Sequence, residues 1–209
     1  MILTDRDKDI LRFIEYYKSS TINQIAKIFY TNNKERYQMA RKRLKLLYEN
    51  KFIKRYRENN RSNCIYYINK RLSTDSLKLL DIYAELVNEG IEIKYFKKEF
   101  IVSTRENNYR IDALIECSYN NKFYPIFVEV DYYHYSGLKR FESIFKTGFM
   151  QSKYKEYGND IFPTVVIIRP TLPIKQVKSD LFNVTYLDFS LKDFKDKIFG
   201  ASPLLDNCK

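Results

Sequence analysis

Apolar residues recur at helical spacing through the first thirty residues of the chain. The first run follows Thr4, a residue type that caps helices, and predicts a helix over about residues 5–18. A second, short helix follows, and its predicted inward face consists of Ile22, Ile25, Ala26 and Phe29. The two helices are short and amphipathic, so each needs a partner on which to bury its apolar side.

A third helix is predicted from Asn33, its capping residue, to about Asn50. Its inward stripe is predicted to consist of Tyr37, Ala40, Leu44 and Leu47. The opposite face carries donors, with Arg36 and Arg43 at its flanks: Lys34, Gln38, Arg41, Lys42 and Lys45. Arg and Gln read base edges in the major groove and Lys binds phosphates, so this helix is predicted to contact double-stranded DNA.

A strand, a polar turn and a second strand follow over residues 52–57, 58–63 and 64–68. This hairpin is basic along one arm and at its tip, where Arg55, Arg57 and Arg61 are placed to touch the DNA backbone or minor groove. The order of two helices, a long basic helix and a hairpin is typical of a winged helix-turn-helix. We therefore predict such a domain over residues 1–70.

The remaining residues, 71–209, predict a second domain of α+β or α/β class. A helix over about 74–88 precedes a strand-rich stretch in which Asn120-Asn121 forms a hairpin turn. The strands are predicted at 91–96, 100–104, 109–117 and 123–132, and after a long helix over 138–157 at 164–168 and 184–189, with further helices at 174–182 and 191–199. A hairpin followed by a crossover helix predicts a mixed sheet with helices around it.

Charge is concentrated in the first domain. Residues 1–70 hold 17 Lys and Arg against 7 Asp and Glu, whereas residues 71–209 hold 20 against 19. Such a local excess favours a polyanionic partner. The chain has no apolar run long enough for a membrane span and no signal core, and its three cysteines and single histidine do not form a metal motif. We expect a cytoplasmic protein with no membrane partner.

The predicted hairpin of the second domain carries three acidic residues that are candidate site residues. Asp112 and Glu129 lie at equal distances from the Asn120-Asn121 turn and are expected to face each other, and Asp131 follows on the same face as Glu129. Three carboxylates at one end of a sheet can hold Mg²⁺ or Mn²⁺. The alternative is a structural cluster, in which Asp112 or Asp131 pairs with Arg110, Lys139 or Arg140.

This order of elements and acidic residues resembles the PD-(D/E)XK nuclease fold. The resemblance implies that Asp112 and Glu129 bind metal and that a lysine stands two residues after the Glu. Here that position holds Asp131, which argues against an enzyme. Lys139 or Lys146, on the following helix, could supply a displaced lysine, so Asp112, Glu129, Asp131 and Lys146 are the candidate catalytic residues of an active form.

A winged helix followed by Arg110-Ile111-Asp112-Ala113 and Glu129-Val130-Asp131 is similar to the replication-relaxation family of plasmid and mobile-element proteins. In that family Asp is common at the third motif position. The resemblance covers about residues 5–190. It implies a role in plasmid replication or DNA mobilisation, together with a nuclease-like second domain that has lost turnover.

We therefore predict a sequence-specific double-stranded DNA-binding protein of a plasmid or other mobile element. Binding itself is expected to need no cofactor. The second domain is expected to form a homodimer or to contact a replication or transfer protein. Two alternatives remain open: a Mg²⁺- or Mn²⁺-dependent endonuclease that cuts near its site, and a transcription regulator with a C-terminal dimerisation or sensing domain.

Overall fold

The computed structural model describes residues 2–59, 62–104, 107–132, 137–158, 160–172 and 176–200. The chain forms two compact units, Met1–Gly90 and Ile91–Lys209. We predicted the boundary after residue 70. It falls after Gly90 instead because the helix over Thr74–Asn88 packs against the second helix of the first unit.

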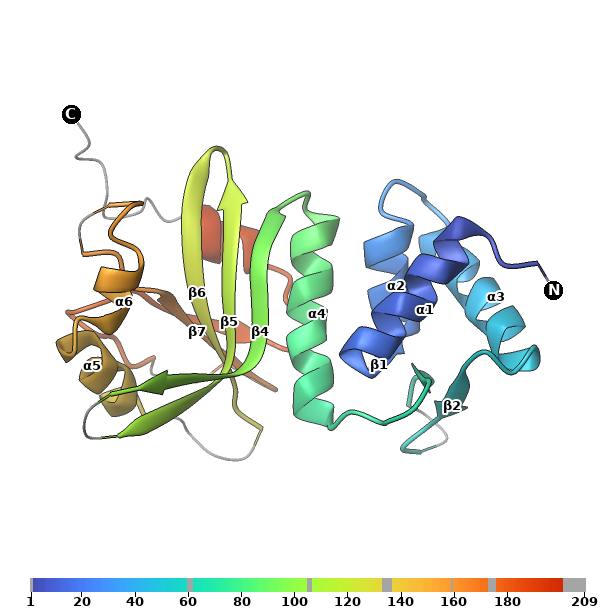
Figure 1. The fold of residues 1–209 in the computed structure, drawn as a ribbon, viewed down its shortest axis with the longest axis horizontal. Coiled ribbons are helices and arrows are strands. Elements are labelled where there is room, and N and C mark those ends of the chain that lie inside the picture. The colour runs from blue at the N-terminus through green and yellow to red at the C-terminus, as the bar shows by residue number, and fades with distance from the viewer. Residues whose placement is uncertain are drawn as a thin grey trace. The chain divides into compact units, whose positions relative to one another are not determined.

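The first unit combines four helices with a small antiparallel sheet (Figure 1). Its elements are α1 (Asp5–Tyr17), β1 (Ser19–Thr21), α2 (Ile22–Phe29), α3 (Arg36–Glu49), β2 (Lys54–Tyr56), β3 (Ile65–Tyr67) and α4 (Thr74–Asn88). The strand order is β1-β3-β2. The sequence did not predict β1, because three residues are too few to show an alternating pattern and the strand exists only by pairing with β3.

Reciprocal capping sets where α1 and α2 begin. The Thr4 side chain accepts a hydrogen bond from the backbone N–H of Asp7, whose carboxylate accepts one from the Thr4 N–H. Thr21 and Gln24 form the same arrangement at the start of α2. Each box satisfies backbone donors that the first helical turn leaves without partners, which confirms the predicted Thr4 cap.

The core of the first unit lies between α1, α2 and α3. Its fully buried side chains include Ile10, Ile14, Ile25, Ala40, Leu44 and Leu47. Burying one such aliphatic side chain contributes about 1.5–3 kcal/mol, so this small cluster is the main source of the unit's cohesion. Tyr37, predicted to face inward, is 36% exposed, because it lies at the edge of the buried stripe on α3.

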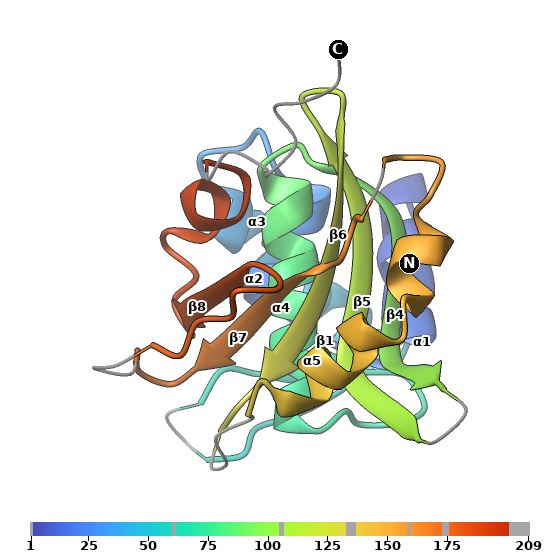
Figure 2. The ribbon, with the colours of Figure 1, turned by 90° about the vertical axis from the view of Figure 1, so that its left-hand side faces the viewer.

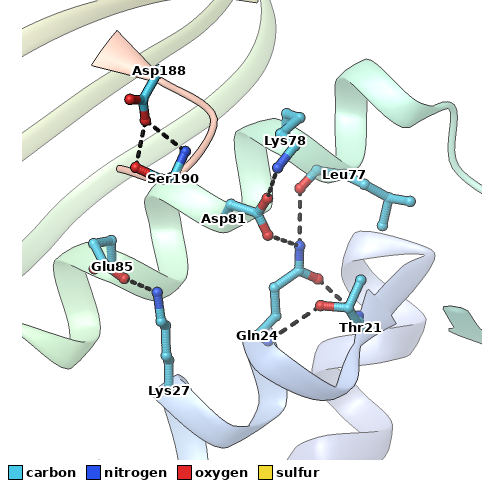
Figure 3. Close-up of polar contacts among 9 residues, drawn as sticks. All are labelled: Thr21, Gln24, Lys27, Leu77, Lys78, Asp81, Glu85, Asp188 and Ser190. Carbon is cyan, nitrogen blue, oxygen red and sulfur yellow. Dashed lines mark hydrogen bonds and ion pairs between the residues drawn. The ribbon is translucent and has the colours of Figure 1, made fainter. Parts of the chain in front are cut away.

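Polar contacts join α2 to α4 (Figure 3). The Gln24 amide nitrogen donates to the Leu77 carbonyl at 2.9 Å and to the Asp81 carboxylate at 2.7 Å. One turn further on, Lys27 forms an ion pair with Glu85. These contacts, together with the apolar face of α4, make this helix part of the first unit.

The second unit is built on a five-stranded mixed sheet of order β4-β5-β6-β7-β8 (Figures 1 and 2). Its strands are β4 (Glu92–Ser103), β5 (Asn108–Tyr119), β6 (Lys122–Val130), β7 (Thr164–Arg169) and β8 (Val184–Asp188). The first three pair antiparallel and the last two join in parallel. Asn120 and Asn121 have φ of 50° and 61°, which confirms the predicted tight turn between β5 and β6.

The helices α5 (Lys139–Lys146) and α6 (Phe149–Lys153) lie on one face of this sheet, as Figure 2 shows. Phe141 and Ile144 of α5 and Met150 of α6 are fully buried against apolar side chains of the strands, such as Phe127. These buried side chains determine which side of α5 faces the sheet. They therefore also determine where the polar side chains of α5 lie.

Four elements of this unit differ from the sequence prediction. Strand β4 is continuous where two strands were predicted, since the chain stays paired to β5 through Lys97–Phe100. The predicted long helix breaks at Gly148, whose φ of 68° is left-handed. Residues 176–182 contain no helix, and the last predicted helix is reduced to turns and a short π-helix over Asp196–Gly200.

None of the helices in the described part of the chain is long and apolar enough to cross a membrane.

Candidate functional site

One face of α3 presents a group of polar side chains to solvent. Gln38, Arg41, Lys42 and Lys45 are all exposed, and they lie opposite the buried stripe of Ala40, Leu44 and Leu47. Lys45 has a loose ion pair with Glu49, at 3.6 Å, one turn along the helix. Surface pairs of this kind hold side chains weakly, so this cation can exchange its partner for another anion.

The start of α3 differs from the prediction. The Asn33 side chain accepts a hydrogen bond from the Glu35 N–H at 2.7 Å, which holds a turn before the helix, and α3 begins at Arg36. Lys34 therefore lies in this turn, exposed, and not on the helix. Arg36 is half-buried and donates to the Asn88 side chain of α4, so its guanidinium is already engaged within the unit.

The hairpin β2–β3 carries two of the three predicted wing arginines in the described residues. The Arg55 guanidinium lies 4.2 Å from the centre of the Tyr48 ring of α3, which is a cation–π contact. The Arg57 Nε donates to the Cys64 Sγ at 2.9 Å across the hairpin. Arg61 lies outside the described residues.

Arg43 differs from the exposed basic residues of α3 because its side chain binds an acidic residue within the first unit. It donates from two nitrogens to the two carboxylate oxygens of Asp7 in α1. Burial of Asp7 opposes its ionisation, but the hydrogen bonds from Arg43 and Thr4 outweigh that effect and lower its pKa to about 2. The sequence shows that residue 43 is basic, but it does not show that Arg43 forms an ion pair within the unit.

In the second unit, Asp112 and Glu129 meet at one end of the sheet. The β5–β6 register pairs Ala113 with Val128, so the next pair along is Asp112 and Glu129, as predicted from the turn. The Asp112 Oδ2 accepts a hydrogen bond from the Val130 N–H at 2.8 Å, and the Asp112 N–H points to the Glu129 Oε1 at 3.4 Å. The hairpin thus holds the two carboxyl groups side by side.

The cation beside this pair is Arg140 of α5. Its Nη2 lies 2.5 Å from the Glu129 Oε2, and the Glu129 side chain is only 4% exposed. Burial and the neighbouring Asp112 carboxylate raise the pKa of Glu129 to about 8, against the opposite effect of Arg140. The buried Glu129 carboxyl group, beside the half-buried Asp112, is therefore protonated more readily than an ordinary glutamate.

Asp131 has its own partner. Arg169, the last residue of β7, donates to the Asp131 Oδ2 from Nη2 at 2.9 Å and from Nε at 3.2 Å. Both residues are buried, and the Asp131 N–H continues the ladder by donating to the Ile168 carbonyl at 2.8 Å. The sequence signal for Arg169 as a site residue is a single charge at the end of an apolar run.

The other cations considered from the sequence lie elsewhere. Arg110 forms its ion pair with Glu99, at 3.7 Å. Lys146 lines a groove of about 780 Å³ together with hydroxyl-bearing residues such as Tyr109 and Ser143. Lys139 is exposed on α5, one residue before the arginine that contacts Glu129.

The carboxylates do not fit a Mg²⁺ or Mn²⁺ centre of the kind that the nuclease resemblance implies. Glu129 forms an ion pair with Arg140, and Asp131 forms one with Arg169, so both carboxylates already have a cationic partner. Among the described residues no group of three or more His, Cys, Asp or Glu side chains is arranged to hold a metal ion. The expected three-carboxylate cluster is thus a pair of carboxyl groups and a separate salt bridge.

Comparison with known proteins adds no relative: no family model matches the chain, and no curated protein or solved structure matches it significantly. The similarity to replication-relaxation proteins and to PD-(D/E)XK nucleases therefore rests on the short sequence motifs alone.

Proposed function

We propose that the first unit binds double-stranded DNA and that α3 is its recognition helix. The observation that carries the proposal is the face of α3 formed by Gln38, Arg41, Lys42 and Lys45, which is exposed and opposite a fully buried stripe. Such a helix can enter the major groove while its other side stays packed. Arginine and glutamine suit base edges, and the lysines suit phosphates.

The order of elements supports the proposal. Two helices, a third helix and a two-stranded hairpin follow one another, and the hairpin completes a three-stranded sheet with β1. Such an order of elements is typical of a winged helix, and we propose that the hairpin serves as the wing. Arg55 of the hairpin packs on the Tyr48 ring of α3, so the hairpin and the helix are in direct contact.

The distribution of charge supports it as well. The excess of 17 basic over 7 acidic residues lies within residues 1–70. Two members of that excess, Arg36 and Arg43, are bound to Asn88 and Asp7 within the unit. The exposed cations Arg41, Lys42 and Lys45 of α3 can neutralise phosphates, and their contribution must weaken as salt rises.

The experiment is a fluorescence-anisotropy titration of a labelled duplex with the full chain at several salt concentrations between 50 and 200 mM. The test variant is Arg41→Ala with Lys42→Ala. The matched control is Lys8→Ala with Arg12→Ala, which removes the same charge from exposed residues of α1 that pair with Asp5 and Asp9. If both α3 residues contact phosphates, the salt slope falls by about 2.

We expect the α3 variant to lose about tenfold or more in affinity and the control to bind nearly as the wild type does. Equal losses in the two variants would mean that binding follows net charge alone. Unchanged affinity and slope in the α3 variant would remove α3 from the interface.

We further propose, on the sequence motifs alone, that the bound site belongs to a plasmid or other mobile element and serves replication, mobilisation or their regulation. Competition between duplexes from the chain's own replicon and unrelated duplexes of equal length tests this. A preference of less than about tenfold for every replicon fragment would speak against a sequence-specific role, since specific binders exceed their non-specific affinity by about 10³ or more.

A further inference from the structure

A groove of about 780 Å³ lies within the second unit, between one end of the β4–β5 pair and the corner formed by α5 and α6. The strands contribute residues such as Ser103 and Tyr109, and the helical corner contributes residues such as Lys146 and Phe149. We propose that this groove binds a nucleotide, with the phosphate held by Lys146 and neighbouring hydroxyl groups and the base stacked on Phe149. The site is separate from α3, so the inference does not rest on duplex binding by the first unit.

The polar side chains of the groove are hydroxyl groups and one cation. Six of the described lining residues carry a hydroxyl group, one is a lysine and none is acidic. Lys146 is exposed, and it forms no ion pair with a described residue, including Glu142 one turn before it in α5. An ammonium group surrounded by hydroxyl groups suits the oxygens of a phosphate, because both can donate hydrogen bonds to it.

Hydrogen bonds within the unit leave only some of these hydroxyl groups available to a ligand. Three already donate to backbone carbonyls of their own turns, namely those of Thr104, Ser143 and Thr147. The Tyr109 hydroxyl accepts from the Asn107 side chain at 3.4 Å, so its own proton stays available. The hydroxyl groups of Ser103 and Ser152 have no partner among the described residues. Three hydroxyl donors therefore remain beside Lys146.

Phe149 adds an aromatic surface to these donors. It follows Phe141 and Phe145 at the four-residue spacing of one helix face, so a continuous helix would bury all three together. The helix instead breaks at Gly148, and whereas Phe141 is fully buried, Phe149 is 43% exposed and lines the groove. A phosphate alone gives no role to this ring. A nucleotide does, because every base has a flat face that can stack on an aromatic side chain.

NMR titration of the isotope-labelled full chain with deoxyadenosine monophosphate (dAMP) tests the proposal. We expect saturable shifts at the amides that line the groove, those of Ser103, Tyr109, Phe149 and Ser152, with a dissociation constant below about 1 mM. Absence of a saturable shift at these amides up to about 10 mM dAMP overturns the proposal. This measurement uses the wild type, so it stands whether or not any variant folds.

Two variants separate the phosphate from the base. Lys146→Gln should weaken dAMP binding about tenfold, because a hydrogen bond to a charged group is lost. Lys155→Gln is the matched control, since Lys155 is exposed and lies outside the groove, and it should bind as the wild type does. Phe149→Leu should weaken dAMP binding about fivefold or more and leave the binding of inorganic phosphate unchanged. Circular dichroism melting checks that each variant is folded.

Equal losses in the two lysine variants would overturn the proposal, as would equal affinities of the wild type for dAMP and inorganic phosphate. A single-stranded oligodeoxyadenylate identifies the source of the nucleotide. Tighter binding than dAMP at the same amides, reduced in Lys146→Gln, indicates a nucleic-acid strand, and equal binding indicates a free nucleotide. The α3 variant Arg41→Ala/Lys42→Ala should bind dAMP as the wild type does, so failure of duplex binding and failure of this site are distinguishable.

Discussion

Arg43 of α3 binds the carboxylate of Asp7 in α1 through two parallel hydrogen bonds, and the Asp7 side chain is almost completely buried. The same carboxylate caps α1 through Thr4. The Asp7 carboxylate therefore both caps α1 and links α1 to α3.

Replacing Asp7 by Asn should destabilise the first unit by about 3 kcal/mol, because removal of one partner from a buried ion pair leaves the other charge uncompensated. Urea unfolding followed by circular dichroism measures the change. Asp9→Asn is the matched control, since Asp9 pairs with Arg12 on the surface. Asp9→Asn should lower the free energy of unfolding by less than about 1 kcal/mol. Similar losses of stability at both positions would show that the Asp7–Arg43 pair stabilises the unit no more than a surface ion pair does.

The same pair gives the first unit a dependence on acid. The folded-state pKa of Asp7 is lowered to about 2 from an ordinary value of 3.8. Its stabilisation is therefore complete above about pH 4 and is lost as the pH falls toward 2, because the unfolded chain then binds the proton more readily. Hydrogen exchange of α1 and α3 amides between these pH values should show the loss. In Asp7→Asn the dependence should be flatter.

Glu129 should give the second unit the opposite dependence. Its folded-state pKa is raised to about 8 from 4.5. The folded state therefore binds the proton more tightly, and stability falls as the pH rises from about 4.5 to 8. Hydrogen exchange of β5 and β6 amides, compared between wild type and Glu129→Gln, measures this. A slope that is the same in both proteins over this range would rule out Glu129 as its source.

The turn between β5 and β6 offers a test of backbone conformation. Asn121 has a φ of 61°, which β-branched residues rarely adopt. Asn121→Val should cost about 1–2 kcal/mol, whereas Asn121→Gly should keep stability within about 1 kcal/mol of wild type. Urea unfolding of the two variants provides the comparison. A tolerated valine would mean that this turn does not fix the register of Asp112 against Glu129.

The sequence by itself determined the elements whose signals are local. The Thr4 cap, the buried positions Ala40, Leu44 and Leu47 and the Asn120-Asn121 turn follow from helical period, capping chemistry and turn preference, and the structure agrees with each. The facing of Asp112 and Glu129 follows from the turn as well, because residues equidistant from a two-residue turn oppose each other.

Only the tertiary structure decided which charges are available. Arg36, Arg43, Arg140 and Arg169 look in sequence like the other cations, yet each is engaged by a partner at least 11 positions away along the chain, from Glu129 for Arg140 to Asn88 for Arg36. Likewise β1 exists only through β3, and α4 belongs to the first unit only through its contacts with α2. Such pairings depend on where separate elements meet in space, and no local pattern of residues encodes that meeting.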